Sequence, residues 1–234
     1  MQANERSGTA VLLFVREEDA EQRIKRWVKK TAAGVRVSRL LNARALTVAR
    51  RSGLPVWVIK GSRQQGATFG ERFANAFEEL FAAGYQRVIA IGNDSLRLRS
   101  SDLAAAGRLL ERFPWVIGPA HDGGAYLVAV DKKAYNRAQW LQAPWETARV
   151  NEALQQMATE AGFLCGRLRR LADADGADAL RQEWKALPKD HLLCRALRVL
   201  LFRTPGVLNG AILAPALLFW RQTSPGRAPP HLFY

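Results

Sequence analysis

Short apolar runs alternate with amphipathic segments along the first two-thirds of the chain. The run 88–91 is apolar at every position, which is typical of a strand buried on both faces. Between such runs, apolar residues recur at helical spacing, as Phe73, Ala76 and Phe77 do. The pattern predicts strands at 10–15, 56–59, 88–91, 115–117 and 126–130, and helices at 20–30, 38–51, 69–82, 101–113 and 150–161.

This alternation predicts an α/β fold, with a Rossmann-like mixed, mostly parallel sheet flanked by helices. The close strand pair around Asp122-Gly123-Gly124 adds an antiparallel element. In open α/β sheets, ligands bind in the crevice beyond the carboxyl ends of the strands. Asp94 follows one such strand after Gly92, so this edge is where we expect the functional site.

Composition and charge narrow the partners. The 234 residues are 48% hydrophobic, enough for one good-sized domain plus an appendage. The net charge of +14 is uneven, since residues 22–70 contain twelve Lys or Arg and no Asp or Glu. Such a segment attracts phosphates on a nucleotide, a nucleic acid or a lipid, although a solvated basic helix face explains it equally well. Nucleic acid is disfavoured, because no binding motif is present and few aromatics interleave the basic residues.

The compartment is predicted from two features. The apolar run 10–15 is followed at once by Arg16 and several acids, which suits a strand better than the core of a secretory signal. Cys165 and Cys194 show no metal-ligand spacing and are interpreted as buried thiols in a reducing compartment. We therefore expect a cytoplasmic protein.

The C-terminal part differs in character, and we expect a domain over 1–185 and a basic, apolar helical extension over 186–234. Residues 191–203 contain Arg195, Arg198 and Arg203 but no acid, apart from the preceding Asp190. The apolar run 207–220 is about 14 residues long, too short to span a membrane. The extension is either a basic helix resting on anionic lipid or on a partner protein, or a pair of helices packed on the domain or in a dimer contact.

Five segments occur in an order that resembles a known family. They are Gln64-Gln65-Gly66 with the helix 69–77, Ile91-Gly92-Asn93-Asp94-Ser95, the segment 118–127, Trp145-Glu146-Thr147, and Leu171-Ala172-Asp173-Ala174-Asp175. Together they resemble a bacterial family of nucleotide-diphospho-sugar-transferase-like proteins of unknown function, also called radical-SAM/selenodomain-associated transferases. The resemblance covers about residues 10–182 and implies a glycosyltransferase-A type fold with a nucleotide site.

The resemblance also implies a divalent metal, Mg²⁺ or Mn²⁺, held by Asp94, Asp173 and Asp175. Hard cations of this kind prefer carboxylate oxygens, with phosphates and waters completing the shell. Asp173 and Asp175 are two apart, so on an extended segment they point the same way. The alternative is structural, because a capping or turn aspartate explains Asp94 and an Asp-Gly turn explains Asp175.

Further residues are expected around the nucleotide. Asp122 is the candidate catalytic group, which orients an acceptor hydroxyl or acts as a base; alternatively, Asp122-Gly123-Gly124 is only a hairpin turn. The predicted nucleotide-binding residues are Arg16, Arg72, Asn75, Gly92, Gly123 and Gly124. For Arg72 and Asn75, a plain surface role is the alternative.

Two departures from the family pattern bear on function. No glycine lies between Val15 and Gly34, where a glycine-bearing phosphate loop is usual, so Arg16 would have to compensate with its side chain. Arg97 stands where a second acid is expected. The leading hypothesis is a metal-dependent transferase that acts on a nucleotide or nucleotide-sugar by glycosyl or nucleotidyl transfer. The alternative is a catalytically degenerate relative that binds a ligand or partner at the membrane surface or elsewhere.

Overall fold

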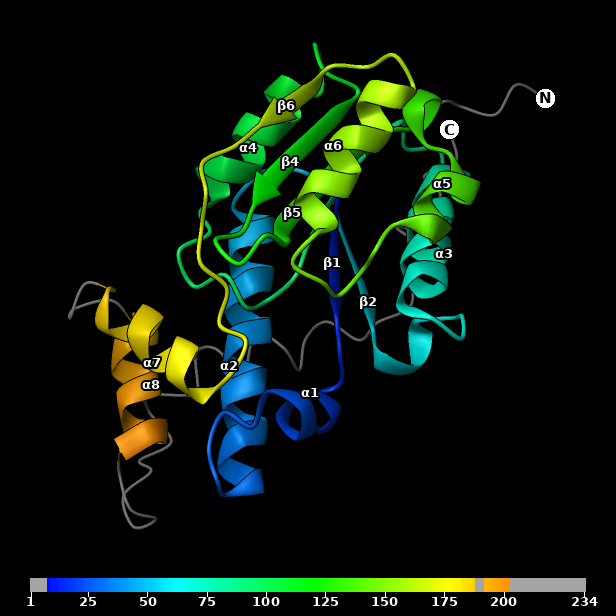
Figure 1. The fold of residues 1–234 in the computed structure, drawn as a ribbon. Coiled ribbons are helices and arrows are strands. Elements are labelled where there is room, and N and C mark those ends of the chain that lie inside the picture. The colour runs from blue at the N-terminus through cyan, green and yellow to red at the C-terminus, as the bar shows by residue number, and fades with distance from the viewer. Residues whose placement is uncertain (1–7, 188–191, 203–234) are drawn as a thin grey trace, which may run out of the picture.

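The computed structural model describes residues 8–187 and 192–202, and Figure 1 shows the arrangement of its elements. The described residues form a six-stranded sheet in the order β2-β1-β3-β5-β4-β6. The strands are β1 (Thr9–Val15), β2 (Val56–Lys60), β3 (Arg87–Ile91), β4 (Trp115–Pro119), β5 (Ala125–Asp131) and β6 (Cys165–Arg167). The helices are α1 (Glu18–Lys25), α2 (Thr31–Arg50), α3 (Phe69–Ala82), α4 (Ser100–Leu109), α5 (Arg137–Gln142), α6 (Val150–Glu160), α7 (Ala177–Lys185) and α8 (Leu192–Phe202).

Strand direction confirms the prediction of a mixed, mostly parallel sheet. β1 pairs in parallel with β2 and β3, and β4 pairs in parallel with β6. Among the described strands only β5 runs the other way, antiparallel to both β3 and β4. The carboxyl ends of β1, β2, β3 and β4 therefore meet at one edge of the sheet, together with the start of β5.

Alternate residues of each strand face two different hydrophobic clusters. In β1, Leu12 joins the cluster that contains Phe77 of α3, whereas Leu13 joins the cluster that contains Leu46 of α2. In Figure 1, α3, α5 and α6 accordingly cover one face of the sheet, and α2 and α4 cover the other. The sheet is buried on both faces, which explains why its strands read as continuous apolar runs.

A third cluster ties the C-terminal helices to α2. Trp27 and Leu41 pack there with Leu180 of α7 and Leu197 of α8. α8 thus packs back on the chain, one of the two predicted arrangements, while the domain boundary after residue 185 stays a prediction. In the described part of the chain no helix is long and apolar enough to cross a membrane. The apolar run 207–220 and the tail after it lie outside the described residues.

The structure differs from the sequence prediction mainly at weakly patterned segments. Helix α2 begins at Thr31 rather than near residue 38, and Gly34 lies in its first turns. A Cβ atom at Gly34 would lie 1.8 Å from the Gln22 side chain, so glycine permits the close approach of α1 to α2. The short elements α5, β6 and α7 were not predicted, because none shows an extended periodic pattern.

Candidate functional site

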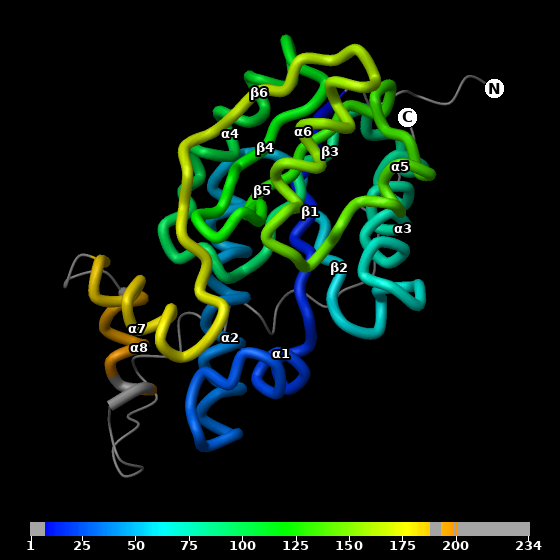
Figure 2. Tube along the Cα trace, viewed as in Figure 1, coloured from blue at the N-terminus to red at the C-terminus, as the bar shows by residue number. Residues whose placement is uncertain are grey.

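A cleft of about 440 Å³ lies at the carboxyl edge of the sheet. It is lined by the end of β1, the first residues after β3, the β4–β5 turn, the start of α3 and the segment after β6. Figure 2 shows that last segment running from β6 past β4 toward α7. It is joined to the edge by the bridge between Ala120 and Leu171 and by the hydrogen bond from the Ala174 N–H to the Asp94 carbonyl oxygen (3.1 Å).

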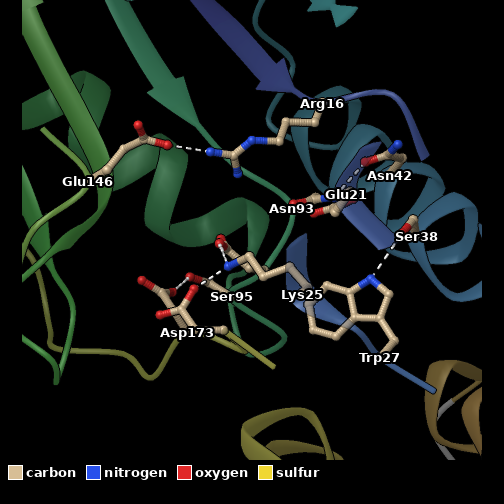
Figure 3. A network of polar contacts seen from close by, with 12 residues as sticks. Arg16, Glu21, Lys25, Trp27, Ser38, Asn42, Asn93, Ser95, Glu146 and Asp173 are labelled. Atoms are coloured by element: carbon tan, nitrogen blue, oxygen red, sulfur yellow. Dashed lines mark hydrogen bonds and ion pairs between the residues drawn. The ribbon is translucent and has the colours of Figure 1, made fainter. Parts of the chain in front are cut away.

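Three of the predicted aspartates share one end of this cleft. Asp94, Asp173 and Asp175, here called the aspartate cluster, all line it. The Ser95 hydroxyl donates a hydrogen bond to the Asp173 carboxylate, as Figure 3 shows. Burial and the negative charges of Asp94, Asp175 and Asp122 raise the pKa of Asp173 to about 8, which the Ser95 hydrogen bond opposes only in part. The cluster is therefore an electrostatically crowded, acidic end of the cleft.

The ammonium group of Lys25 lies against this cluster (Figure 3). Its Nζ is 3.2 Å from Asp94 Oδ2 and also forms an ion pair with Asp175 Oδ1. Only 9% of the Lys25 side chain is exposed. Burial lowers the pKa of Lys25, but the two carboxylates outweigh burial, so the pKa is raised and the group is charged at neutral pH.

The aspartate cluster does not fit a divalent ion in this arrangement. Among residues 8–187 and 192–202, no group of three or more His, Cys, Asp or Glu side chains is placed to hold a metal. Carboxylates are suitable ligands for Mg²⁺ or Mn²⁺, but two of the three already contact the Lys25 ammonium. Metal binding by Asp94, Asp173 and Asp175 stays a prediction.

Behind the cleft lies a buried set of polar residues, Glu18, Glu21, Asn42 and Asn93, here called the wall network. Asn93 Nδ2 donates hydrogen bonds to Glu21 Oε2 (2.8 Å) and to Asn42 Oδ1 (2.6 Å). Asn42 Nδ2 donates to Glu18 Oε1 (3.2 Å). Burial, together with the charge of Asp94, raises the pKa of Glu21 to about 7, against the Asn93 hydrogen bond. The sequence gave no sign of this burial, because Glu21 stands in a run of four acids.

The predicted Arg16 lines the cleft and forms an ion pair with Glu146 (Figure 3). Arg16 follows β1, whereas Glu146 lies between α5 and α6, so this pair joins two sides of the cleft. Glu146 has a positive φ of 60°, an uncommon conformation for a residue other than glycine. Arg16 thus has a carboxylate partner where a bound phosphate would be a competing one.

The predicted β4–β5 turn residues take different positions. Asp122 and Gly124 line the cleft, and the Asp122 carboxylate accepts a hydrogen bond from the Gly124 N–H (2.9 Å), which is a turn-forming contact. Gly123 does not line it. At Gly123, φ is 92° and a Cβ atom would lie 2.0 Å from the Ala148 carbonyl oxygen, so glycine is required by the neighbouring backbone.

Of the other predicted nucleotide-binding residues, Gly92 and Arg72 line the cleft and Asn75 does not. Asn75 Nδ2 donates to the Gln65 carbonyl oxygen (2.8 Å), and Arg72 Nη1 donates to the Ala67 carbonyl oxygen (3.1 Å). Both contacts hold the loop before α3. Arg72 combines this contact with a position on the cleft.

Aromatic side chains form another wall of the cleft. Phe14, Phe69 and Trp145 are half-buried and line it. The ring centroids of Phe69 and Trp145 are 5.8 Å apart, and those of Phe14 and Phe69 are also 5.8 Å apart. Sequence reasoning did not assign these rings to the site, because an aromatic residue in a strand or helix is usually core.

Arg97, which replaces an expected acid, points elsewhere. Its guanidinium forms a two-point contact with the Glu183 carboxylate of α7, with Nε–Oε2 at 2.8 Å and Nη2–Oε1 at 2.7 Å. Glu183 is buried, and Arg97 does not line the cleft. The substitution therefore ties the loop after β3 to α7.

Comparison with known proteins places the chain in a family. The family model described as "Uncharacterized protein conserved in bacteria (DUF2064)" matches residues 2–147, more than half of the chain. The chain belongs to this family. The expected bacterial family of unknown function is thereby confirmed. Among curated proteins, none matches the chain.

Solved structures identify the fold of this DUF2064 protein. A "putative nucleotide-diphospho-sugar transferase" from Desulfovibrio desulfuricans G20 has a TM-score of 0.74 at 20% identity, with 90% of this chain and 98% of that chain covered. The predicted nucleotide-diphospho-sugar-transferase-like fold is therefore confirmed. Rv0371C of Mycobacterium tuberculosis H37Rv, in complex with manganese, and CMP:2-keto-3-deoxy-manno-octonic acid synthetase, in complex with CTP, each have a TM-score of 0.40 at 12% identity over 75% of this chain and 98% of theirs.

Proposed function

We propose that this protein is a transferase whose donor is a nucleotide or a nucleotide-diphospho-sugar. The observation that carries the proposal is the cleft itself, which lies at the carboxyl edge of the sheet, where α/β folds bind ligands. Along this one cleft lie aromatic rings, cationic side chains and carboxylates. These are the groups that a base, a diphosphate and a reacting hydroxyl each need.

Each part of the donor has a chemically matched wall. The faces of Phe14, Phe69 and Trp145 suit stacking with a nucleobase, which gains about 1–3 kcal/mol per base in known single-stranded nucleic-acid sites. Arg16 and Arg72 are guanidinium donors for phosphate oxygens, and Lys25 adds a third positive charge. These cations replace, with side chains, the backbone cradle that a glycine-bearing loop after β1 would provide.

The chemistry follows from what the carboxylates can do. In glycosyl transfer, the acceptor hydroxyl oxygen bonds to the anomeric carbon, the bond from that carbon to the diphosphate breaks, and a nucleoside diphosphate leaves. Asp122 is the proposed acceptor of the hydroxyl proton. In nucleotidyl transfer, the acceptor oxygen attacks the α-phosphorus and pyrophosphate leaves. In both reactions the cationic side chains would stabilise the charge that develops on the leaving group.

A second candidate is a relative that binds its ligand without turnover. Two observations favour it: Arg16 is paired with Glu146, and Arg97 is committed to Glu183 outside the cleft. Such a protein could use the exposed Arg195 and Arg198 of α8 to contact an acidic partner or an anionic membrane. Its retained cleft would then report ligand binding to that partner.

One experiment separates the two. We would titrate the protein calorimetrically with nucleoside triphosphates and nucleotide-sugars, and measure nucleotide released from each donor. Asp94→Asn is the test variant, and Asp178→Asn on α7, where the side chain is 89% exposed, is the matched control. A transferase should lose about 100-fold or more of its turnover in Asp94→Asn. Binding with no turnover in the unaltered protein would favour the second candidate, and no binding would contradict both.

A further inference from the structure

Lys25 lies where the sequence pattern predicts a metal ion. The aspartate cluster receives a positive charge from this side chain, which contacts Asp94 and Asp175 at once. These two carboxylates come from the turns after β3 and β6, far apart along the chain. A divalent ion in such a site would join the same two segments.

The position of Lys25 is fixed by its neighbours. Lys25 is the last residue of α1, and the chain turns at once through Arg26, whose φ of 48° is left-handed. The next residue, Trp27, is fully buried, and its indole N–H donates to the Ser38 hydroxyl (2.9 Å), as Figure 3 shows. The Lys25 Nζ lies 5.9 Å from the centre of the Trp27 ring. A buried ring and a sharp turn therefore aim the ammonium group into the cleft.

An ammonium group can supply part of what a divalent ion supplies. It carries three N–H donors, and two of them suffice for the Asp94 and Asp175 contacts. The remaining donor faces the cleft side of the cluster and suits a phosphate oxygen. A monovalent charge offsets less of a diphosphate than a divalent one, but Arg16 and Arg72 line the same cleft.

We propose that the Lys25 ammonium group is the resident cation of this cleft, in place of a divalent ion, so that nucleotide binding does not depend on divalent metal. The inference rests on the proposed function, since it concerns how the same cleft holds a donor's phosphates. Removal of Lys25 should have the opposite sign for metal. With the ammonium gone, Asp94, Asp173 and Asp175 are left to attract a cation, and the altered cleft should bind Mn²⁺.

The test uses four probes, UDP, CDP, GDP and ADP, in calorimetric titrations with EDTA and again with Mn²⁺. We expect at least one to bind with the same affinity in both conditions. Lys25→Met should weaken that binding about tenfold or more, because a charge-assisted hydrogen bond is lost. The matched control is Lys29→Met, an exposed lysine four residues away, which should change nothing. Lys25→Arg keeps the charge and should keep metal-independent binding.

A second measurement does not need a nucleotide. Free Mn²⁺ gives an electron paramagnetic resonance signal that is lost on binding to protein. The unaltered protein should leave the signal intact, and Lys25→Met, if folded by circular dichroism, should reduce it. Stoichiometric Mn²⁺ binding by the unaltered protein, or nucleotide binding that requires Mn²⁺, overturns this inference but not the proposed function. If none of the four probes binds in either condition, the proposed function fails and this inference fails with it.

Discussion

The wall network and the aspartate cluster begin at the same turn after β3, yet they accommodate negative charge in different ways. In the wall network, the amides of Asn42 and Asn93 solvate Glu18 and Glu21 by hydrogen bonds in the interior. In the aspartate cluster, carboxylates crowd one another, and their cation comes from Lys25. The adjacent residues Asn93 and Asp94 therefore belong to a structural and a ligand-facing group respectively.

The difference shows how burial separates the two roles. Glu21, Asn42 and Asn93 are 2%, 3% and 6% exposed, so loss of a partner there leaves a polar group that water cannot reach. Asp175 is 55% exposed at its side chain, and water replaces a lost contact. Substitutions in the wall network should act on stability, and those in the cluster on ligand binding.

The largest expected effect is a pH dependence from Glu21. Its pKa is raised from 4.5 to about 7 in the folded protein, so between these values the folded state holds a proton that the unfolded state has released. Folding stability should therefore fall as pH rises from about 4.5 to 7, by up to about 3 kcal/mol, and then level off. Urea unfolding at a series of pH values measures this. Glu21→Gln, which mimics the protonated acid, should flatten the curve; an unchanged slope would contradict the prediction.

Next in size is Asn93→Ala, which we expect to cost about 2 kcal/mol in the free energy of unfolding, because Glu21 and Asn42 lose a buried donor. The comparison variant is Asp175→Asn, with an expected change within about 0.5 kcal/mol. Chemical denaturation at pH 7 measures both. Equal losses in the two variants would break the distinction between wall network and aspartate cluster.

A smaller loss is expected when Arg97 is replaced. Arg97→Ala removes the two-point contact with the buried Glu183, which should lower stability by about 1 kcal/mol. Nucleotide affinity should not change, because Arg97 does not line the cleft. Thermal unfolding and calorimetric titration give the two readouts. A tenfold loss of affinity with intact stability would assign Arg97 to the ligand instead.

The smallest effect on stability is expected at the pair that joins two sides of the cleft. Glu146→Gln should change stability by less than about 0.5 kcal/mol, because both partners are substantially exposed. Nucleotide affinity should rise about threefold, since Arg16 no longer has a competing carboxylate. Glu111→Gln, at an exposed glutamate away from the cleft, is the control for the change in net charge. Weaker binding in Glu146→Gln would show that Glu146 supports the ligand.

Strand positions could be predicted because burial on both faces leaves a continuous apolar run, as in β3. Helix α3 could be predicted to its ends, because its apolar stripe follows a start signal, the capping box of Thr68 and Glu71. The three residues of β6 carry no such pattern; that strand exists because β4 offers it an edge. Tertiary pairing, rather than local preference, determines this element.

The site could be predicted in part for the same reason. Asp94 and Asp122 follow strand ends, and the strand-end rule alone brings them to one cleft. Lys25, Glu21 and the partner of Arg16 could not be assigned, because their roles depend on the direction in which α1 and the α5–α6 loop leave the sheet. In the sequence Glu21 counted against phosphate binding, whereas in the structure it faces amides in the interior.

The bridge between Ala120 and Leu171 has a consequence for folding. The cleft draws on residues from 14 to 175, so it is assembled almost entirely from contacts between distant parts of the chain. Contacts of that kind form late and slowly, because long loops must close before they are made. Asp173 and Asp175 reach the cleft only after β6 has paired with β4. Recovery of nucleotide binding should therefore lag behind recovery of helix content during refolding, and the ligand becomes a probe of the last step.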